Sequence, residues 1–284
     1  MPTGTQVLVE APLAAAGIPN PRRYREIEQW RTRPLTGTYR YVFLSEITIK
    51  RRGNGRENKV SVLIAMGVNK SGFREIVGVG ESNASNHDKW LIFLRHLVSR
   101  GLNGVQLVVA DRYPSLKEAV QEVLPKAKYQ RSTVQFYLEI LKVTPNDRMK
   151  EVVALLNDIF ACLTVEEASF RYGHAAERLQ AMGLDSAKDL LDFEIADTMH
   201  YFSFPQDHWI RIRSDNGMEC ALIEISQRSG EVGVFPGGQS VLMFVCSVLL
   251  EVSSSRWMKK RFIGVHKQTG DQAYMAESDQ SEAL

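Results

Sequence analysis

The sequence predicts an α/β protein with a mixed sheet that is flanked by helices, and three observations support this prediction. Residues 105–110 are an uncharged run rich in β-branched side chains, which is typical of a strand buried on both faces. Apolar residues recur at helical spacing on both sides of this run. Farther upstream, a turn of Gly and Asn residues separates two segments in which apolar and polar residues alternate, as they do in strands. Strands and helices therefore belong to one α/β fold.

The composition is that of an ordinary globular chain: 284 residues, 24% charged and 44% hydrophobic, with a net charge of +2. This charge is too small to predict a nucleic-acid binder by itself. Cys162, Cys220 and Cys246 are odd in number and widely spaced, which indicates a reducing compartment without a disulfide framework. Without a signal sequence or an apolar run long enough to cross a bilayer, we expect a cytoplasmic protein with no membrane partner.

Residues 1–35 are expected to form a lead-in and a short basic helix. Prolines and glycines interrupt the lead-in. Tyr24, Ile27 and Trp30 then recur at three-residue spacing among several arginines, and Pro34 ends the pattern. The basic face suits phosphate contact, although a solvated helix surface is the commoner explanation.

Three strands are predicted next, at residues 41–50, 60–68 and 73–79, and the turn at residues 53–55 predicts a hairpin between the first two. The hairpin carries the densest positive cluster in the first half of the chain: Lys50, Arg51, Arg52, Arg56 and Lys59. Contact with DNA phosphates and ordinary solvation of turn charges are both open interpretations.

A helix, a strand, a second helix and a strand are then expected, the strands at residues 105–111 and 127–131. This succession predicts a parallel, right-handed strand–helix–strand unit. Capping boxes mark the helix starts, at Ser85 with Asp88 and at Ser115 with Glu118.

Residues 132–204 are predicted to be an all-helical block, which is either a separate domain or an insertion in the α/β unit. Two further helices, beginning near Asp215 and Gln239, are expected to pack back on the sheet. Capping boxes again mark helix starts within the block, at Thr164 with Glu167 and at Ser186 with Asp189.

Two carboxylates are candidate functional residues. Asp111 ends the buried strand, and ligands of open α/β sheets lie beyond the carboxyl ends of strands. An Asp that only opens a turn is an equally good interpretation. Glu219 borders the apolar stripe of the helix near Asp215, where it can face the mouth of the sheet, although surface Glu residues are usual on such helices.

A series of segments runs in order through residues 21–264: RTRPLTG (31–37), VSVLIAMGVN (60–69), FREIVGV (73–79), FLRHL (93–97), RGL (100–102), VVAD (108–111), QR (130–131), FPQDHWIR (204–211) and VFPGGQS (234–240). Together they resemble the bacterial insertion-sequence transposases of the Mutator family. The similarity covers nearly the whole chain.

This resemblance implies a ribonuclease H-like core over residues 36–131 and 205–265, with the helical insertion between its two parts and a polar tail at residues 266–284. It implies DNA strand cleavage and strand transfer by an Asp, Asp, Glu triad that binds Mg²⁺ or Mn²⁺. Asp111 maps to the second acid and Glu219 to the third. The implied partners are transposon-end and target DNA, bound by a homo-oligomer, with Arg131 and the hairpin cations as DNA contacts.

Several positions depart from the family pattern. Ser45 stands where the first acid is expected, and a neutral hydroxyl is a poor Mg²⁺ ligand. Glu46 is its neighbour, but successive strand side chains point to opposite faces, so Glu46 cannot replace it. Other departures are Ser132 and Gln135 in place of a Cys and His pair, and Asp215 and Gly217 in place of Asn and Pro.

The resemblance therefore predicts a transposase with an impaired, weakened metal site. Family members also carry an N-terminal DNA-binding segment, so a truncated member is expected. One alternative is a catalytically inactive DNA-binding protein that regulates a transposase. Another is a metal-dependent hydrolase with a different substrate, and the separation of the Asp111 and Glu219 carboxylates would distinguish these possibilities.

Overall fold

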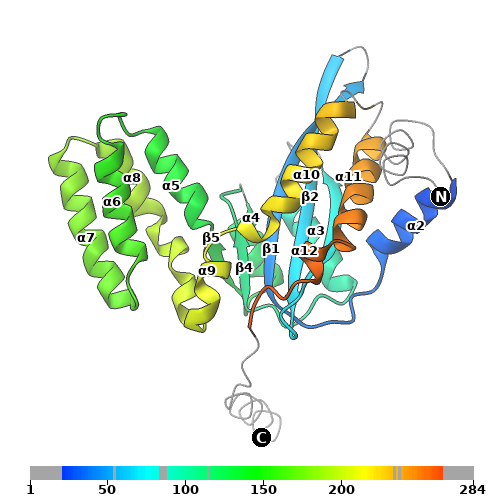
Figure 1. Ribbon diagram of the computed structural model, residues 1–284, viewed down its shortest axis with the longest axis horizontal. Coiled ribbons are helices and arrows are strands. Elements are labelled where there is room, and N and C mark those ends of the chain that lie inside the picture. Colours follow the sequence, from blue (N-terminus) through cyan, green and yellow to red (C-terminus); the bar gives the residue numbers. More distant parts are fainter. Residues whose placement is uncertain are drawn as a thin grey trace, which may run out of the picture.

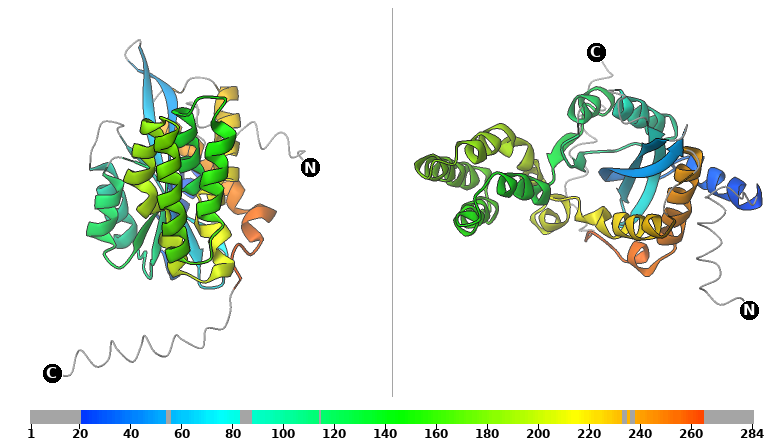
Figure 2. Two further views of the ribbon diagram at one scale, coloured as in Figure 1. Left: turned by 90° about the vertical axis from the view of Figure 1, so that its left-hand side faces the viewer. Right: turned by 90° about the horizontal axis from the view of Figure 1, so that it is seen from above.

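The computed structural model describes residues 21–53, 56–82, 88–113, 115–232, 235 and 238–264. Five strands form one mixed sheet in the order β3-β2-β1-β4-β5. Helices cover both faces of this sheet, and a helical block extends beside it (Figure 1; Figure 2). The predicted α/β class with a mixed sheet is confirmed, while the predicted lead-in before residue 21 and the polar tail lie outside the described residues.

The first three strands form the predicted antiparallel meander: β1 (Tyr39–Gly53), β2 (Arg56–Asn69) and β3 (Arg74–Ser82). Gly53 pairs with Arg56, so the predicted hairpin is confirmed. Its strands are longer than expected because backbone pairing continues through the charged residues, which alternation of apolar side chains does not detect. Asn54 and Gly55 lie outside the described residues.

The two remaining strands are parallel to β1. β4 (Leu107–Ala110) pairs with β1, and β5 (Lys128–Arg131) pairs with β4. Between them the chain forms α4 (Leu116–Val123), so the predicted parallel strand–helix–strand unit is confirmed. The preceding helix, α3 (Lys89–Ser99), is followed by Gly101. Gly101 has a φ of +106°, and a Cβ there would lie 2.4 Å from the Leu35 carbonyl oxygen, so a side chain is excluded.

The predicted helix starts had mixed outcomes. Thr164 is a cap as expected, since its hydroxyl accepts a hydrogen bond from the Glu167 N–H at 3.1 Å. A helix does begin after Ser115 as predicted, but the expected capping bond is absent, because Ser115 has a φ of 59° and its side chain makes no capping bond. The helix predicted at Ser186 is present but begins one residue earlier, at Asp185, so Ser186 is not its cap. Ser85 lies outside the described residues.

Side-chain alternation in the strands separates two cores. Val42, Leu44 and Val108 pack with α3 and α4 on one face of the sheet. Tyr41 and Phe43 point to the other face, which is covered by α10 (Asn216–Val232) and α11 (Gly238–Ser253). The view from above in Figure 2 shows these two helical layers on opposite sides of the strands. The predicted return of the last long helices to the sheet is confirmed. The short helices α2 (Pro21–Thr32) and α12 (Arg256–Lys259) lie at the edge of the α11 layer.

Residues 132–204 are all described and contain helices and turns but no strand. Their apolar core is continuous with that of the α10 and α11 face, so the block is packed against the α/β unit.

No described helix has the length and apolar content needed to span a bilayer. The elements from residue 133 to α10 are α5 (Thr133–Lys142), α6 (Met149–Phe160), α7 (Val165–Ala181), α8 (Asp185–Glu194), the 3₁₀ turns η1 (Ile195–Thr198), η2 (His200–Ser203) and η3 (Gln206–His208), and α9 (Trp209–Ile212).

Candidate functional site

The carboxyl ends of β1 and β4 place Ser45 and Asp111 at equivalent positions. Leu44 pairs with Ala110 across the two parallel strands. Ser45 follows Leu44, and Asp111 follows Ala110. Because successive side chains of a strand point to opposite faces, Ser45 and Asp111 both point to the face that α10 covers. The position expected for the first acid is therefore next to Asp111, but a buried hydroxyl occupies it.

Glu46 points to the opposite face, as the sequence predicts. Its two carboxylate oxygens accept hydrogen bonds from the Lys89 ammonium at 2.8 and 2.7 Å. These side chains are only 11% and 8% exposed, so Glu46 is committed to a buried ion pair. Tyr113 lies near the strand end, where its hydroxyl accepts from the Glu46 N–H at 3.2 Å and hydrogen-bonds Ser45. Burial raises the pKa of Tyr113.

Asp111 is half-buried, and its Oδ1 accepts a hydrogen bond from the Arg112 backbone N–H at 2.7 Å. Burial raises the pKa of this carboxyl above its ordinary value, while that hydrogen bond and the charge of Arg131 act in the opposite direction. The nearby carboxylates of Asp215 and Glu139 raise the pKa further. Burial is therefore the main cause of the raised pKa of Asp111, and charges of both signs act on this carboxyl.

Asp215 is the acid that the sequence interpretation missed, since it was considered only as a departure from the family pattern. Its Oδ1 accepts a hydrogen bond from the Ser132 hydroxyl at 2.7 Å. The Ser132 N–H in turn donates to the Ala110 carbonyl at 2.7 Å, which connects Asp215 to the end of β4. One signal could have found it: Asp215 precedes Glu219 by one helical turn, so the two acids share the start of α10.

Glu219 lies in the first turn of α10 with an exposed side chain. That turn packs on the sheet, because a Cβ on Gly217 would lie 3.1 Å from Phe262 and 3.5 Å from Phe43. The start of α10 is thus above the β1 face that also carries Ser45. The charge of Asp215 raises the pKa of Asp111, whereas Glu219 lies at the surface. Across the described residues, no group of three or more His, Cys, Asp or Glu side chains has the geometry to hold a metal ion.

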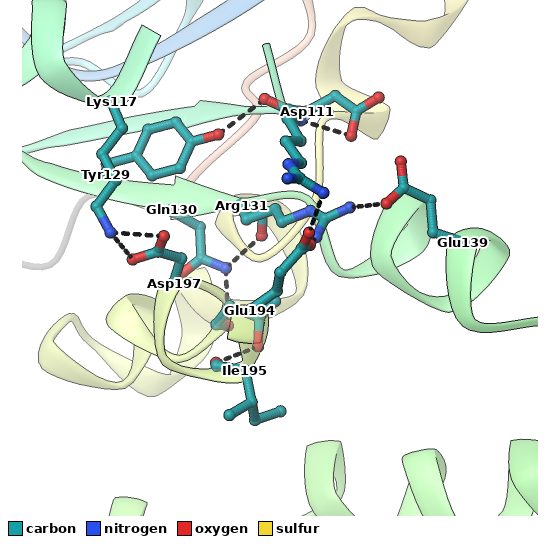
Figure 3. Close-up of polar contacts among 11 residues, drawn as sticks. Asp111, Lys117, Tyr129, Gln130, Arg131, Glu139, Glu194, Ile195 and Asp197 are labelled. Atoms are coloured by element: carbon teal, nitrogen blue, oxygen red, sulfur yellow. Dashed lines mark hydrogen bonds and ion pairs between the residues drawn. The ribbon is translucent and has the colours of Figure 1, made fainter. Parts of the chain in front are cut away.

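The side chain of Arg131, which the resemblance implies as a DNA contact, is only 3% exposed. It pairs with Glu139 at 2.7 Å and with Glu194, because α5 and the end of α8 cover the end of β5. Glu194 also pairs with Arg112 at 2.7 Å. Figure 3 shows Arg131 between the two carboxylates and close to Asp111. The positive charge of the buried Arg131 therefore lowers the pKa of Asp111, against the larger effect of burial, which raises it.

The hairpin contributes an exposed Lys50 on β1. The side chains of residues 51–58, which include Arg51, Arg52 and Arg56, lie outside the described part of the structure. The predicted contact between the hairpin and DNA phosphates remains a prediction.

A family model described as "Transposase, Mutator family" matches residues 21–260, which is most of the chain. The chain belongs to the Mutator family of transposases. It is 32% identical over 256 residues to the transposase for insertion sequence element IS1081 of Mycobacterium tuberculosis, covering 89% of this chain and 61% of that protein. It is 34% identical over 235 residues to the transposase for IS406 of Burkholderia multivorans, covering 82% of this chain and 59% of that protein.

A more distant relative is the transposase for insertion sequence element IS256 in transposon Tn4001 of Staphylococcus aureus, at 26% identity over 230 residues. The alignment covers 80% of this Mutator-family chain and 58% of that relative. This chain therefore matches about three fifths of the length of these transposases.

The acidic residues near Asp111 in this Mutator-family chain carry carboxylate oxygens, the ligand type that divalent cations prefer. Mg²⁺ is commonly held by one or two carboxylates, with water and substrate phosphate completing its octahedron. Asp111 and Asp215 are carboxylates of this type, and the charge of Asp215 raises the pKa of Asp111. Ser45 adds only a neutral oxygen. A second ion would require Glu219 to turn inward from its exposed position.

Proposed function

We propose that this chain contains the ribonuclease H-like core of a transposase, interrupted by a helical insertion at residues 132–204. In this proposal it cleaves a DNA strand and transfers it by metal-dependent phosphoryl transfer. The supporting observation is the register of β1 and β4, which puts Ser45 beside Asp111 at the carboxyl ends of adjacent strands. Membership of the Mutator family supports DNA as the partner.

In the proposed mechanism, Asp111 would hold a divalent cation together with Asp215 or Glu219. Bound Mg²⁺ or Mn²⁺ would supply Lewis-acid stabilisation of the phosphate and activation of the attacking oxygen. The Arg112 N–H fixes the orientation of the Asp111 carboxylate, and the positive charge of Arg131 favours its ionised form. Lys50 and its neighbours on the hairpin contact the DNA backbone.

Ser45 makes this activity weak. Because Ser45 stands where the family pattern has a carboxylate, the remaining acids would hold at least one of two divalent cations less tightly. We expect strand cleavage to fall by several orders of magnitude, as when a main electrostatic stabiliser is removed. Glu46 offers no replacement because it is paired with Lys89.

A second candidate function is that of an inactive DNA-binding protein that assembles with a full-length transposase and regulates it. The buried ion pair between Glu46 and Lys89 favours this candidate. Glu46 is the only carboxylate next to position 45 in β1, and the pairing prevents it from acting as a metal ligand. In either case the proposed setting is a homo-oligomer on DNA in the bacterial cytoplasm and nucleoid.

To test this proposal, the unmodified chain and a Ser45→Asp variant are each incubated with DNA that carries transposon ends and with Mg²⁺ or Mn²⁺, and strand nicking is measured. A full-length relative, inactivated at its own acids, contributes end binding. We expect little nicking by the unmodified chain and a gain of nicking by the variant. Robust nicking by the unmodified chain would contradict impairment. DNA binding without cleavage by either protein would favour the regulatory candidate.

A further inference from the structure

Phe193 is a large apolar side chain that the packing of the helical block leaves outside. It is 73% exposed, at the penultimate position of α8. Single exposed apolar residues are ordinary, so exposure alone indicates nothing. Phe193 differs because the Arg112 guanidinium lies over its ring, 5.5 Å from the centroid. An aromatic face and a cation are therefore adjacent at the surface, immediately beside Asp111.

The Arg112 guanidinium is fixed by a buried carboxylate. Its Nη1 donates to Glu194 at 2.7 Å, and the Glu194 side chain is only 5% exposed. Glu194 is shared with Arg131, so Arg112 has no carboxylate to itself. The Arg112 side chain is nevertheless 53% exposed. A guanidinium that is fixed on one side and solvent-facing on the other is preorganised to bind phosphate.

The location gives this pair its significance. Arg112 directly follows Asp111, and its backbone N–H donates to the Asp111 carboxylate. A DNA phosphate bound by the Arg112 guanidinium would therefore lie close to the Asp111 carboxylate. In a duplex both faces of each base are stacked, so only an unpaired nucleotide can offer a face to Phe193.

We propose that Arg112 and Phe193 bind an unpaired nucleotide at the DNA strand end, with its phosphate on Arg112 and its base stacked on Phe193. This inference rests on the proposed function, because DNA must be the substrate. Neither residue belongs to the Asp, Asp, Glu triad. The pair would hold the strand end beside Asp111 and resist its return to the duplex.

The experiment uses the full chain and two short duplexes of the same sequence, one blunt and one with an unpaired 3′ nucleotide that is 2-aminopurine. Binding is followed by anisotropy, and stacking by quenching of 2-aminopurine fluorescence. We expect Phe193→Ala to weaken binding of the overhang duplex about tenfold and to abolish quenching, without affecting the blunt duplex. Phe193→Trp should retain both signals.

Phe170 provides the matched control, because it is 75% exposed on α7 of the same helical block. Phe170→Ala should behave like the unmodified chain. Arg112→Gln should weaken binding of the overhang duplex and reduce its salt dependence by about one phosphate contact. The inference is overturned if Phe193→Ala binds the overhang duplex normally, or if it loses affinity for both duplexes equally. If the unmodified chain binds neither duplex, DNA binding itself fails and the proposed function falls with it.

Discussion

Ser45 and Asp111 are neighbours across two parallel strands, because Leu44 and Ala110 are paired in the residues immediately before them. A carboxylate at position 45 would therefore face the same site as Asp111. The hydroxyl that is present is buried and hydrogen-bonded to Tyr113. This relationship locates the departure from the family pattern at the centre of the candidate site.

Ser45→Asp should create a stronger divalent cation site. Without metal, the new carboxylate is buried near Asp111 and lowers the melting temperature through like-charge repulsion. With Mn²⁺ well above its dissociation constant, the melting temperature should recover by about 5 °C or more, which differential scanning fluorimetry measures. Ser45→Asn is the control, since it matches the shape without the charge. An equal response of both variants to Mn²⁺ would contradict the placement of Ser45 beside Asp111.

Asp215→Asn should weaken Mn²⁺ binding by about tenfold, since Asp215 is in electrostatic contact with Asp111. Glu219→Gln should have a smaller effect in the absence of DNA, because its side chain is exposed and must turn inward. Titrations followed by the electron paramagnetic resonance of free Mn²⁺ compare the two. A loss seen only with Glu219→Gln would show that Asp215 is not a ligand.

Asp111→Asn should raise the melting temperature near neutral pH in the absence of divalent cations. Burial raises the folded-state pKa of Asp111 above its ordinary 3.8, so ionisation destabilises the folded state increasingly as the pH rises above the ordinary value, and fully above the raised one. The gain should disappear as the pH falls below the ordinary value, where the carboxyl is protonated in both states. Thermal unfolding across this range tests the sign. Asp147→Asn, at a position 77% exposed, should show no such trend.

Glu46→Gln and Lys89→Met should each destabilise the protein by about 3–5 kcal/mol, because each leaves a buried charge without its partner. The double variant should be much less destabilised than the sum of the two, since it leaves no buried charge. Urea unfolding gives the three free energies. As a control, Glu122→Gln breaks an exposed pair with Arg95 and should change stability by less than about 1 kcal/mol. Additive effects at positions 46 and 89 would disprove the coupling.

Local sequence patterns were enough to predict that each of the five strands exists, although the two hairpin strands are longer than predicted. The run ending at Asp111 predicts a buried strand because apolar periodicity is a local property that burial imposes on neighbouring residues. The same alternation correctly predicts that Glu46 and Ser45 point to opposite faces. Family membership was likewise evident from segments distributed along the chain.

The contacts between polar groups that are far apart in the sequence became evident from the folded structure. Ser132 and Asp215 are separated by 83 residues, yet they share a hydrogen bond because α5 and α10 both begin at the end of the sheet. Arg131 is buried because Glu139 and Glu194 come to it from separate helices. Charge patterns in a sequence cannot specify such pairs, since ion pairing depends on register and packing between elements, whereas hydrophobic periodicity is fixed within each element.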